Sequence, residues 1–218
     1  MILSFLFTNP ILFFAWIVGI IIAISVHECA HAYTAYRFGD PTARDAGRIS
    51  LNPLRHLDPI GSLIFLIAGF GWGKPVPVNP FNLPDRKRSE AWISFAGPIS
   101  NFLVAFVVSL LLRISVQSLG WNLENMAVQF FATVILINLA LMIFNLIPIP
   151  PLDGSKILFA FLPPRYDYVE ETLERSGPML LFGLLIVDRM FDLGIFGGIL
   201  WGGIEFLSKI LLSGMSVG

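Results

Sequence analysis

The stretch "SVHECAHAYTAYRFGD", residues 25–40, decides how this chain folds, because it places two histidines and a glutamate at the end of one of its most apolar segments. Residues 11–26 form an unbroken apolar run that, extended in both directions, is long enough to cross about 30 Å of hydrocarbon. Ionisable groups inside a membrane helix cost roughly 3 kcal/mol each unless they pair or bind something. The stretch therefore predicts a membrane helix with a functional site near one end.

The composition of the whole chain agrees with a membrane protein. Of its 218 residues, 56% are apolar and only 13% are charged, whereas soluble domains carry about 25% charged residues. The mean hydropathy is +0.77. The formal net charge of −1 argues against nucleic acid as a partner, and the lipid bilayer is the expected surrounding. The single cysteine, Cys29, rules out an internal disulfide and a cysteine zinc cluster.

Four further apolar stretches follow along the chain. Residues 91–112 and 126–147 are long enough to cross a bilayer, whereas residues 60–72 are too few and are rich in glycine. Residues 179–212 are interrupted at 188–194, so they form either two short segments or one crossing and an interfacial helix. We therefore predict an all-α polytopic membrane protein with four to six hydrophobic segments around an intramembrane metal site. A short β-strand and a re-entrant region are expected after the first span.

The positive residues predict the orientation. Clusters of arginine and lysine follow the first span, the short segment and the 126–147 span, whereas only Arg113 lies between the two middle spans. Because cytoplasmic loops carry an excess of positive residues, these clusters belong in the cytoplasm and residues 113–125 belong outside. This holds only if residues 60–72 return to the side that they left. The two histidines then lie toward the cytoplasmic end of the first span.

The histidines and the glutamate have the spacing of a metal site. His27 and His31 are four residues apart, so on a helix they share a face and can hold one metal ion. Glu28 is rotated by about 100° from His27, within reach of a water on that ion. In this H-E-x-x-H arrangement the glutamate is a general base and not a ligand. A membrane histidine can also be a core residue, but such a residue does not need the glutamate, and Cys29 is interpreted as a packing residue.

The third ligand is less certain from spacing. A catalytic zinc site usually has three protein ligands and one open position. Position 37, where a metzincin would place a histidine, is Arg37. His56 is interpreted as a solvated loop residue, and Glu90 lies in a basic loop. Asp153, in a proline-rich turn after the 126–147 span, is better placed, although an Asp-Gly pair also marks an ordinary turn. Spacing alone leaves these two interpretations of Asp153 open.

Three segments outside the spans are expected to be extended. Residues 47–53, "GRISLNP", alternate apolar and polar side chains as a strand does. The free edge of this strand could pair with an extended substrate, or the strand could be a surface feature without a role. Residues 73–85 and 146–154 are rich in proline, which breaks helices. At membrane depth such backbone survives only against protein or a water-filled cavity, so these segments predict a cavity.

Taken together, these motifs resemble the site-2 protease family of intramembrane zinc metalloproteases, and further segments are similar to its prokaryotic branch. The resemblance rests on "HECAH" at 27–31 and "NLIPIPPLDG" at 145–154, with "GRISLNP" at 47–53, "GKPVPVNP" at 73–80 and "AGPISN" at 96–101. It implies one zinc ion per chain, bound by His27, His31 and Asp153. It also implies that Glu28 is the catalytic base and that Asn145 steadies the substrate carbonyl or oxyanion.

The resemblance extends to architecture and partners. The chain, 1–218, is interpreted as a single membrane-embedded peptidase domain with a core at 9–155, C-terminal membrane segments at 178–212, and no PDZ or CBS domain. Within it, Gly97, Pro98 and Asn101 are interpreted as packing residues. We expect transmembrane protein substrates and a prokaryotic inner-membrane location, with the active site toward the cytoplasm. The sequence leaves the oligomeric state open.

The alternative function is a membrane metal-binding protein or metal transporter that uses the same ligands. A transporter is expected to contain two related halves with paired discontinuous helices. The sequence contains no repeat of that kind. A transporter also has no need for Glu28 beside the metal, so the protease is favoured.

Overall fold

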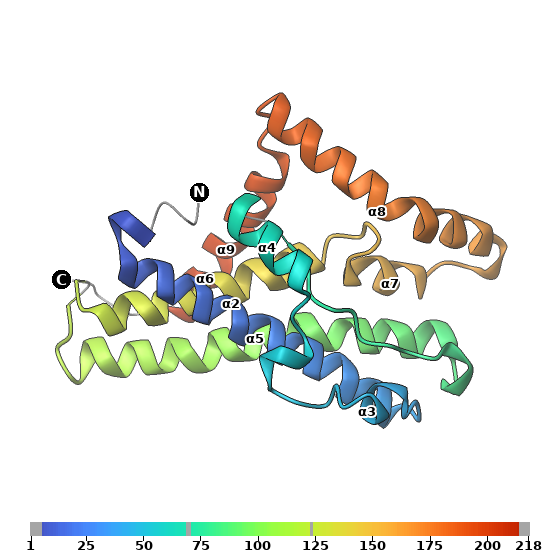
Figure 1. Cartoon of the computed structure of the whole chain (residues 1–218), viewed down its shortest axis with the longest axis horizontal. Coiled ribbons are helices and arrows are strands. Elements are labelled where there is room, and N and C mark those ends of the chain that lie inside the picture. Colours follow the sequence, from blue (N-terminus) through green and yellow to red (C-terminus); the bar gives the residue numbers. More distant parts are fainter. Residues whose placement is uncertain (1–5, 69–70, 123, 214–218) are drawn as a thin grey trace.

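Three long helices form the body of the protein, and each comes from an apolar span predicted above. They are α2 (Pro10–Arg37), α5 (Arg86–Gln117) and α6 (Met126–Asn145). By length and composition, all three are able to cross a membrane. They pack against one another in pairs and run side by side along the long axis of the molecule (Figure 1). The structure is therefore that of an α-helical membrane protein.

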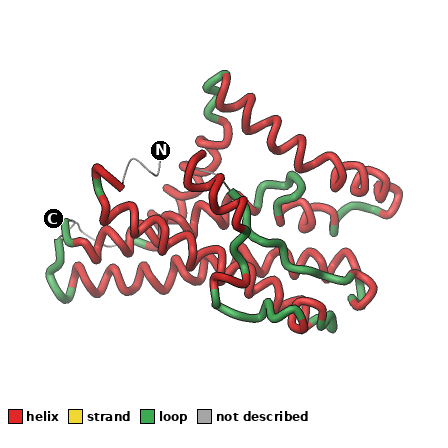
Figure 2. The backbone as a smooth tube through the Cα atoms, in the orientation of Figure 1, coloured by secondary structure: helices red, strands yellow, loops and turns green. Residues whose placement is uncertain are grey.

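The structure is a computed structural model and describes residues 6–68, 71–122 and 124–213. Within these ranges the chain consists of helices and loops, and no strand is formed (Figure 2). Shorter helices lie near the end of α2 that carries the two histidines. They include α3 (Thr42–Asp45) and the single turns η2 (Pro80–Asn82) and η3 (Pro164–Tyr166).

The helix that carries the histidines has clear start and stop signals. Asn9 caps its first turn, because its Oδ1 accepts a hydrogen bond from the Leu12 N–H at 3.1 Å. At the other end Gly39 takes a φ of +99°, and the Asp40 N–H donates back to the Ala35 carbonyl at 3.0 Å. Such a glycine satisfies the last carbonyls of a helix and turns the chain away. These caps fix the length of α2.

α2 packs on its neighbours through small residues. Its buried residues include Ala15, Gly19, Ala23, His27 and His31, at four-residue spacing. A Cβ on Gly19 would lie 2.7 Å from Ile137 Cδ1 of α6, so glycine allows the close approach. Small residues serve this purpose widely in membrane helices. The ridge that packs α2 into the bundle therefore also carries the two histidines into the interior.

The C-terminal segment forms two helices, and the turn between them falls within the interruption predicted at 188–194. α8 (Asp167–Met190) ends at a turn, and α9 (Ile195–Leu211) follows and lies along α6. α5, α6 and α9 share an apolar core formed by Ala105, Leu112, Val128, Ile135, Leu139, Ile204 and Leu211. α8 diverges from the body (Figure 1), and Lys87 of α5 holds its first turn through Asp167 and Glu170, at 2.7 and 3.0 Å.

The short glycine-rich segment returns to its starting point. It contains α4 (Pro59–Ala68), and the residues that flank it, Leu57 and Gly73, form an isolated antiparallel bridge. A Cβ on Gly61 would lie 2.2 Å from the Trp72 carbonyl oxygen, so the outgoing and returning chains touch. The residues on either side of the segment therefore lie next to each other.

The strand predicted at residues 47–53 is wrong. These residues form bends that lead into the single turn η1 (Pro53–Arg55). The side chain of Asn52 accepts a hydrogen bond from the Leu54 N–H at 3.1 Å, and asparagine in this role starts a turn. Side-chain-to-backbone bonds compete with sheet formation, and here they override the alternation of apolar residues. Residues 47–53 therefore form bends and the start of a turn in place of the predicted strand.

Candidate metal centre

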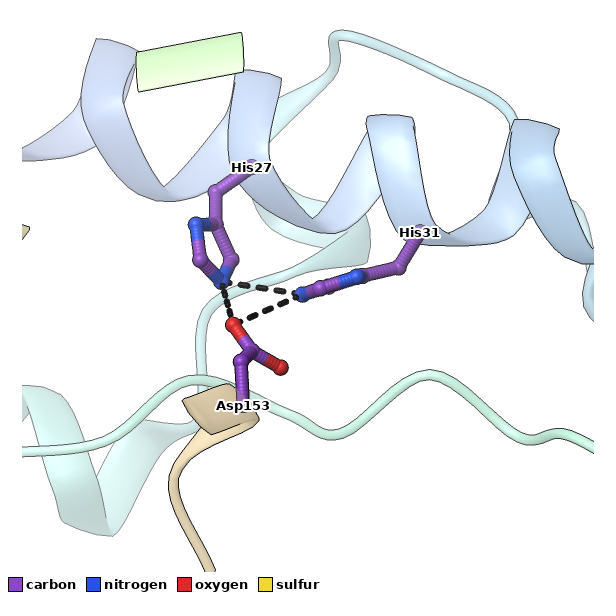
Figure 3. A group of neighbouring side chains, drawn as sticks. All are labelled: His27, His31 and Asp153. Carbon is purple, nitrogen blue, oxygen red and sulfur yellow. Dashed lines mark hydrogen bonds and ion pairs between the residues drawn. The ribbon is translucent and has the colours of Figure 1, made fainter. Parts of the chain in front are cut away.

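His27, His31 and Asp153 meet in the interior of the bundle (Figure 3). The Asp153 Oδ2 lies 3.1 Å from His27 Nε2 and 3.4 Å from His31 Nε2, and the two Nε2 atoms are 2.9 Å apart. Both histidines are buried, with exposed fractions of 5% and 8%. The structure thus brings Asp153, the third ligand suggested by the sequence, next to the two histidines.

The Asp-Gly pair serves both the turn and the site. Asp153 is the first residue of α7 (Asp153–Phe159), which packs against α5. A Cβ on Gly154 would lie 2.3 Å from the Leu146 carbonyl oxygen, so the chain folds back on itself and requires glycine there. The two interpretations of this pair are therefore compatible, because Gly154 makes the turn that delivers Asp153.

Hydrogen bonds from α5 fix which nitrogen of each imidazole carries the proton. The Nδ1 of His31 lies 2.6 Å from the Ile93 carbonyl, which can only accept, so Nδ1 is protonated. The Nδ1 of His27 lies 2.7 Å from Asn101 Oδ1. The amide nitrogen of Asn101 donates to the Ala23 carbonyl at 3.0 Å, so its oxygen faces His27 as an acceptor. Both Nε2 lone pairs are therefore free to bind a metal.

Three electron-pair donors then face one another without a proton between them. The Asp153 Oδ2 is buried and has no hydrogen-bond partner, and the two bare Nε2 atoms repel at 2.9 Å. A divalent cation removes this repulsion. Two imidazole nitrogens and one carboxylate oxygen form a ligand set that zinc accepts, and three protein ligands leave a fourth position for water or substrate. These residues therefore fit a zinc ion.

α5 also provides the space that the imidazoles occupy. A Cβ on Gly97 would lie 2.5 Å from His27 Cε1 and 2.5 Å from His31 Nε2. Ile93, Gly97 and Asn101 are spaced by four residues and so share one face of α5. The interpretation of Gly97 and Asn101 as packing residues is therefore incomplete, since Gly97 lies against both imidazoles and Asn101 is hydrogen-bonded to His27. Their spacing, which matches that of the two histidines, is the signal that could have revealed them.

Glu28 is enclosed by two loop segments. The side chain of Arg48 is 4% exposed and places Nη2 3.8 Å from Glu28 Oε2, and it also donates to the Lys74 carbonyl. A Cβ on Gly73 would lie 3.7 Å from Glu28 Oε1. A buried charge requires a partner of opposite sign, and Arg48 supplies it. Sequence reasoning missed Arg48, whose surroundings in the sequence are those of a surface loop.

Two alternative ligands lie elsewhere. His56 is fully buried, so its interpretation as a solvated residue is wrong, but its Nε2–H donates to the Ser50 carbonyl at 2.6 Å. The polar neighbour that suggested solvation, Arg55, is indeed exposed. Glu90 pairs with Arg86 at 3.1 Å. Neither His56 nor Glu90 belongs to the group formed by the two α2 histidines and the aspartate.

Asn145 is the last residue of α6, where the turn toward Asp153 begins. It is half-buried, and its Nδ2 donates to the Leu141 carbonyl of its own helix at 3.0 Å. Any hydrogen bond from this amide to a substrate therefore requires the intrahelical bond to be exchanged.

Membrane-length helices and a buried H-E-x-x-H site with an added aspartate define a membrane-embedded metallopeptidase. Residues 15–184 match the model of Peptidase family M50. The chain is 43% identical to YwhC of Bacillus subtilis over 180 residues, or 80% of either protein. It is 30% identical to Rip2 of Mycobacterium tuberculosis over 209 residues, or 92% of this chain and 74% of the relative.

A more distant relative is MJ0392 of Methanocaldococcus jannaschii, which is 28% identical over 187 residues, or 83% of this chain and 46% of the relative. The names of all three relatives include the words zinc metalloprotease. No solved structure matches the chain. The chain belongs to peptidase family M50, the site-2 proteases, and is an intramembrane zinc metalloprotease. The resemblance found in the sequence is confirmed, and the transporter alternative is not supported.

Proposed function

We propose that this protein hydrolyses peptide bonds within or near the transmembrane segments of other membrane proteins, with zinc held by His27, His31 and Asp153 and with Glu28 as general base. The observation that carries the proposal is the convergence of two Nε2 lone pairs and an unpartnered carboxylate oxygen. Glu28 is one residue from His27 and enters the same interior from α2. The expected partners are the transmembrane substrates and the lipid bilayer.

The residues divide the chemistry among them. A bound zinc ion supplies polarisation of the scissile carbonyl and a more acidic water. Glu28 accepts the proton of that water while the hydroxyl oxygen attacks the carbonyl carbon, and Glu28 then delivers the proton to the amine as the C–N bond breaks. Arg48 lies 3.8 Å from the Glu28 carboxylate and supplies a positive charge beside it. This arrangement lets one carboxylate both receive and return the proton.

Asn145 is the proposed oxyanion donor. Its amide exchanges the bond to Leu141 for one to the oxygen of the substrate carbonyl as negative charge develops there. Removing a donor of this kind from other enzymes costs about 3 kcal/mol of transition-state stabilisation. The position of Asn145 at the start of the turn that delivers Asp153 supports this role.

The active site is proposed to open toward the cytoplasm of a prokaryotic cell, in its inner membrane. The end of α2 that carries the histidines and the start of α5 lie at the same end of the molecule, and the end of α5 and the start of α6 lie at the other (Figure 1). In the sequence, positive residues lie between the histidines of α2 and the first turn of α5: Arg37, Arg44, Arg48, Arg55, Lys74, Arg86, Lys87 and Arg88. Positive charge is typical of the cytoplasmic side. The segment at 60–72 is then proposed to be a re-entrant element that lines the active-site cavity.

The test is the Glu28→Gln variant of the detergent-purified full chain, measured for zinc content and for cleavage of a model transmembrane substrate. Glutamine keeps the shape of the side chain but does not accept the proton, so cleavage should fall below about 1% of the wild-type rate. Zinc content should stay unchanged, because Glu28 is not a ligand. Glu171→Gln, on the exposed face of α8, is the matched control and should cleave normally. Full activity of Glu28→Gln would remove Glu28 as the base.

A further inference from the structure

A chain of hydrogen bonds runs from the backbone of α6 to His27. The Asn138 Nδ2 donates to the Val134 carbonyl at 2.8 Å, and the Asn138 Oδ1 accepts from Asn101 Nδ2 at 3.0 Å. The Asn101 Oδ1 then accepts from His27 Nδ1 at 2.7 Å. Both asparagines have exposed fractions of 0%. Asn138 therefore does not contact a proposed metal ligand itself, but it is hydrogen-bonded to Asn101, which contacts His27.

Two backbone carbonyls set the direction of every bond in this chain. The carbonyls of Val134 and Ala23 can only accept, so each forces the amide nitrogen of its asparagine to point toward it. Asn138 then presents its oxygen to Asn101, and Asn101 presents its oxygen to His27. The last acceptor places the proton of His27 on Nδ1. The metal-facing Nε2 is left with its lone pair.

We propose that Asn138 is a positioning residue for the metal centre, acting through Asn101 to hold His27 in the form that binds zinc. If Asn101 turned its amide over, its NH2 group would face His27 Nδ1, which would have to give up its proton to Nε2. A protonated Nε2 is not a ligand. Asn138 opposes this turn because its oxygen would then face the Asn101 oxygen. The proposal rests on the proposed metal site and adds to it a residue of α6.

The competing explanation is that Asn138 only joins α6 to α5. Hydrogen bonds between membrane helices contribute about 0.6 kcal/mol on average, so a purely structural role would lower stability a little and leave zinc affinity unchanged. Loss of the outer partner of a metal-binding histidine, in contrast, costs roughly 10- to 100-fold in metal affinity. Zinc affinity therefore separates the two explanations.

The experiment compares Asn138→Leu with Thr133→Val in the detergent-purified full chain, using competition with a chromophoric chelator to measure zinc affinity. Thr133 is the matched control, because it is buried on the same helix and donates only to the Gln129 carbonyl of that helix. Asn138→Leu should weaken zinc binding by roughly 10-fold or more. Thr133→Val should stay within about 2-fold of wild type, since it touches no part of the chain to His27.

Asn138→Asp is the conservative variant that should restore binding. A carboxyl buried in an apolar interior stays neutral, so its O–H can donate to the Val134 carbonyl while its other oxygen accepts from Asn101. Zinc affinity should then lie within about 3-fold of wild type. Equal zinc affinity in Asn138→Leu and wild type would overturn the proposal, and so would an Asn138→Asp variant as weak as Asn138→Leu.

A second measurement does not depend on whether the variants fold. In the zinc-loaded wild type with ¹⁵N-labelled histidine, NMR should show zinc on Nε2 of His27 and a slowly exchanging proton on Nδ1. Zinc on Nδ1, or an Nδ1 proton that exchanges as freely as one in solvent, would contradict the proposal. If the wild type binds no zinc, the proposed metal site itself fails. If it binds zinc and Asn138→Leu binds equally well, only the role of Asn138 fails.

Discussion

The two sides of the active site are built by different means. The helix wall, formed by α2, α5 and the first residue of α7, positions its groups through helix packing, so that His27, His31 and Gly97 follow from four-residue spacing. The loop wall, formed by residues 47–58 and 71–74, positions Arg48 through its bond to the Lys74 carbonyl and its ion pair with Glu28. The helix wall holds the proposed ligands, whereas the loop wall encloses the proposed base. Substitutions in the helix wall should therefore weaken zinc binding, and substitutions in the loop wall should lower the rate of peptide cleavage.

The largest effect is expected from a proposed ligand in the helix wall. Asp153→Asn replaces the only charged ligand of the group, so zinc affinity should fall by more than the roughly 100-fold that loss of an outer partner costs. Cleavage should be lost with it. Chelator competition and metal analysis measure the change, with Asp45→Asn on an exposed side chain as control. Normal zinc content in Asp153→Asn would contradict the proposal that the helix wall holds the metal ligands.

The next largest effect is expected at Gly97. An added Cβ would lie 2.5 Å from both imidazoles, and overpacking of this kind costs about 1–3 kcal/mol. Gly97→Ala should therefore weaken zinc binding by roughly 10- to 100-fold. The control is Gly183→Ala in α8, where a Cβ would meet nothing within 4 Å. Both variants are compared by zinc titration, and equal affinities would show that the ligands do not need this space.

The loop wall should respond differently. Arg48→Ala removes the buried partner of Glu28 and the donor to the Lys74 carbonyl, and hydrogen bonds to charged groups contribute about 1.5–3 kcal/mol. The cleavage rate at saturating substrate should fall by roughly 10- to 100-fold, while zinc content stays at the wild-type level. Arg44→Ala, on a half-exposed side chain nearby, should cleave normally. Loss of zinc in Arg48→Ala would contradict the proposal that the loop wall affects cleavage without affecting zinc binding.

The smallest effect concerns Asp40, which joins the end of α2 to the proline-rich segment. Burial raises the pKa of Asp40, but hydrogen bonds from the side chains of Thr42 and Asn82 and from the Asn79 and Thr42 N–H groups outweigh it, so the pKa is lowered. The stabilisation is therefore complete above the unfolded pKa of about 3.9 and is lost as the pH falls through the folded value. Asp40→Asn should lower stability by about 1–3 kcal/mol at pH 7.

Thermal unfolding in detergent at pH 7 and at pH 3 checks this expectation. The difference between Asp40→Asn and wild type should shrink at pH 3, where the wild-type carboxylate also begins to take up a proton. A difference that is the same at both pH values would show that the charge of Asp40 does not contribute. Zinc content at pH 7 should be equal in both proteins, because Asp40 belongs to neither wall.

Most of the helix wall could be predicted from the sequence, because helical periodicity converts spacing into geometry. His27, His31 and Glu28 follow from one motif, and the apolar lengths predict α2, α5 and α6. Asn101 was accessible only through its spacing from Gly97 on α5. The loop wall could not be predicted, since bonds such as that from His56 to the Ser50 carbonyl depend on the path of the chain.

The same limit explains the wrong strand at residues 47–53. The apolar alternation in residues 47–53 favours a strand, but the Asn52 cap selects a turn instead. A local hydrogen bond, which pattern alone does not reveal, decides this case. The interruption at 188–194, by contrast, is visible in the sequence and contains the turn between α8 and α9.

X-ray absorption at the zinc edge of the detergent-purified wild-type protein tests the central claim most directly. The proposed site predicts two imidazole nitrogens at about 2.0–2.1 Å and oxygen at about 2.0–2.2 Å, with no sulfur. Asp153→Asn should change the oxygen contribution and leave the imidazole signal of any residual zinc. A sulfur neighbour at about 2.3 Å would place Cys29 on the metal, and a single imidazole would separate His27 from His31. Either result would contradict a zinc centre built from His27, His31 and Asp153.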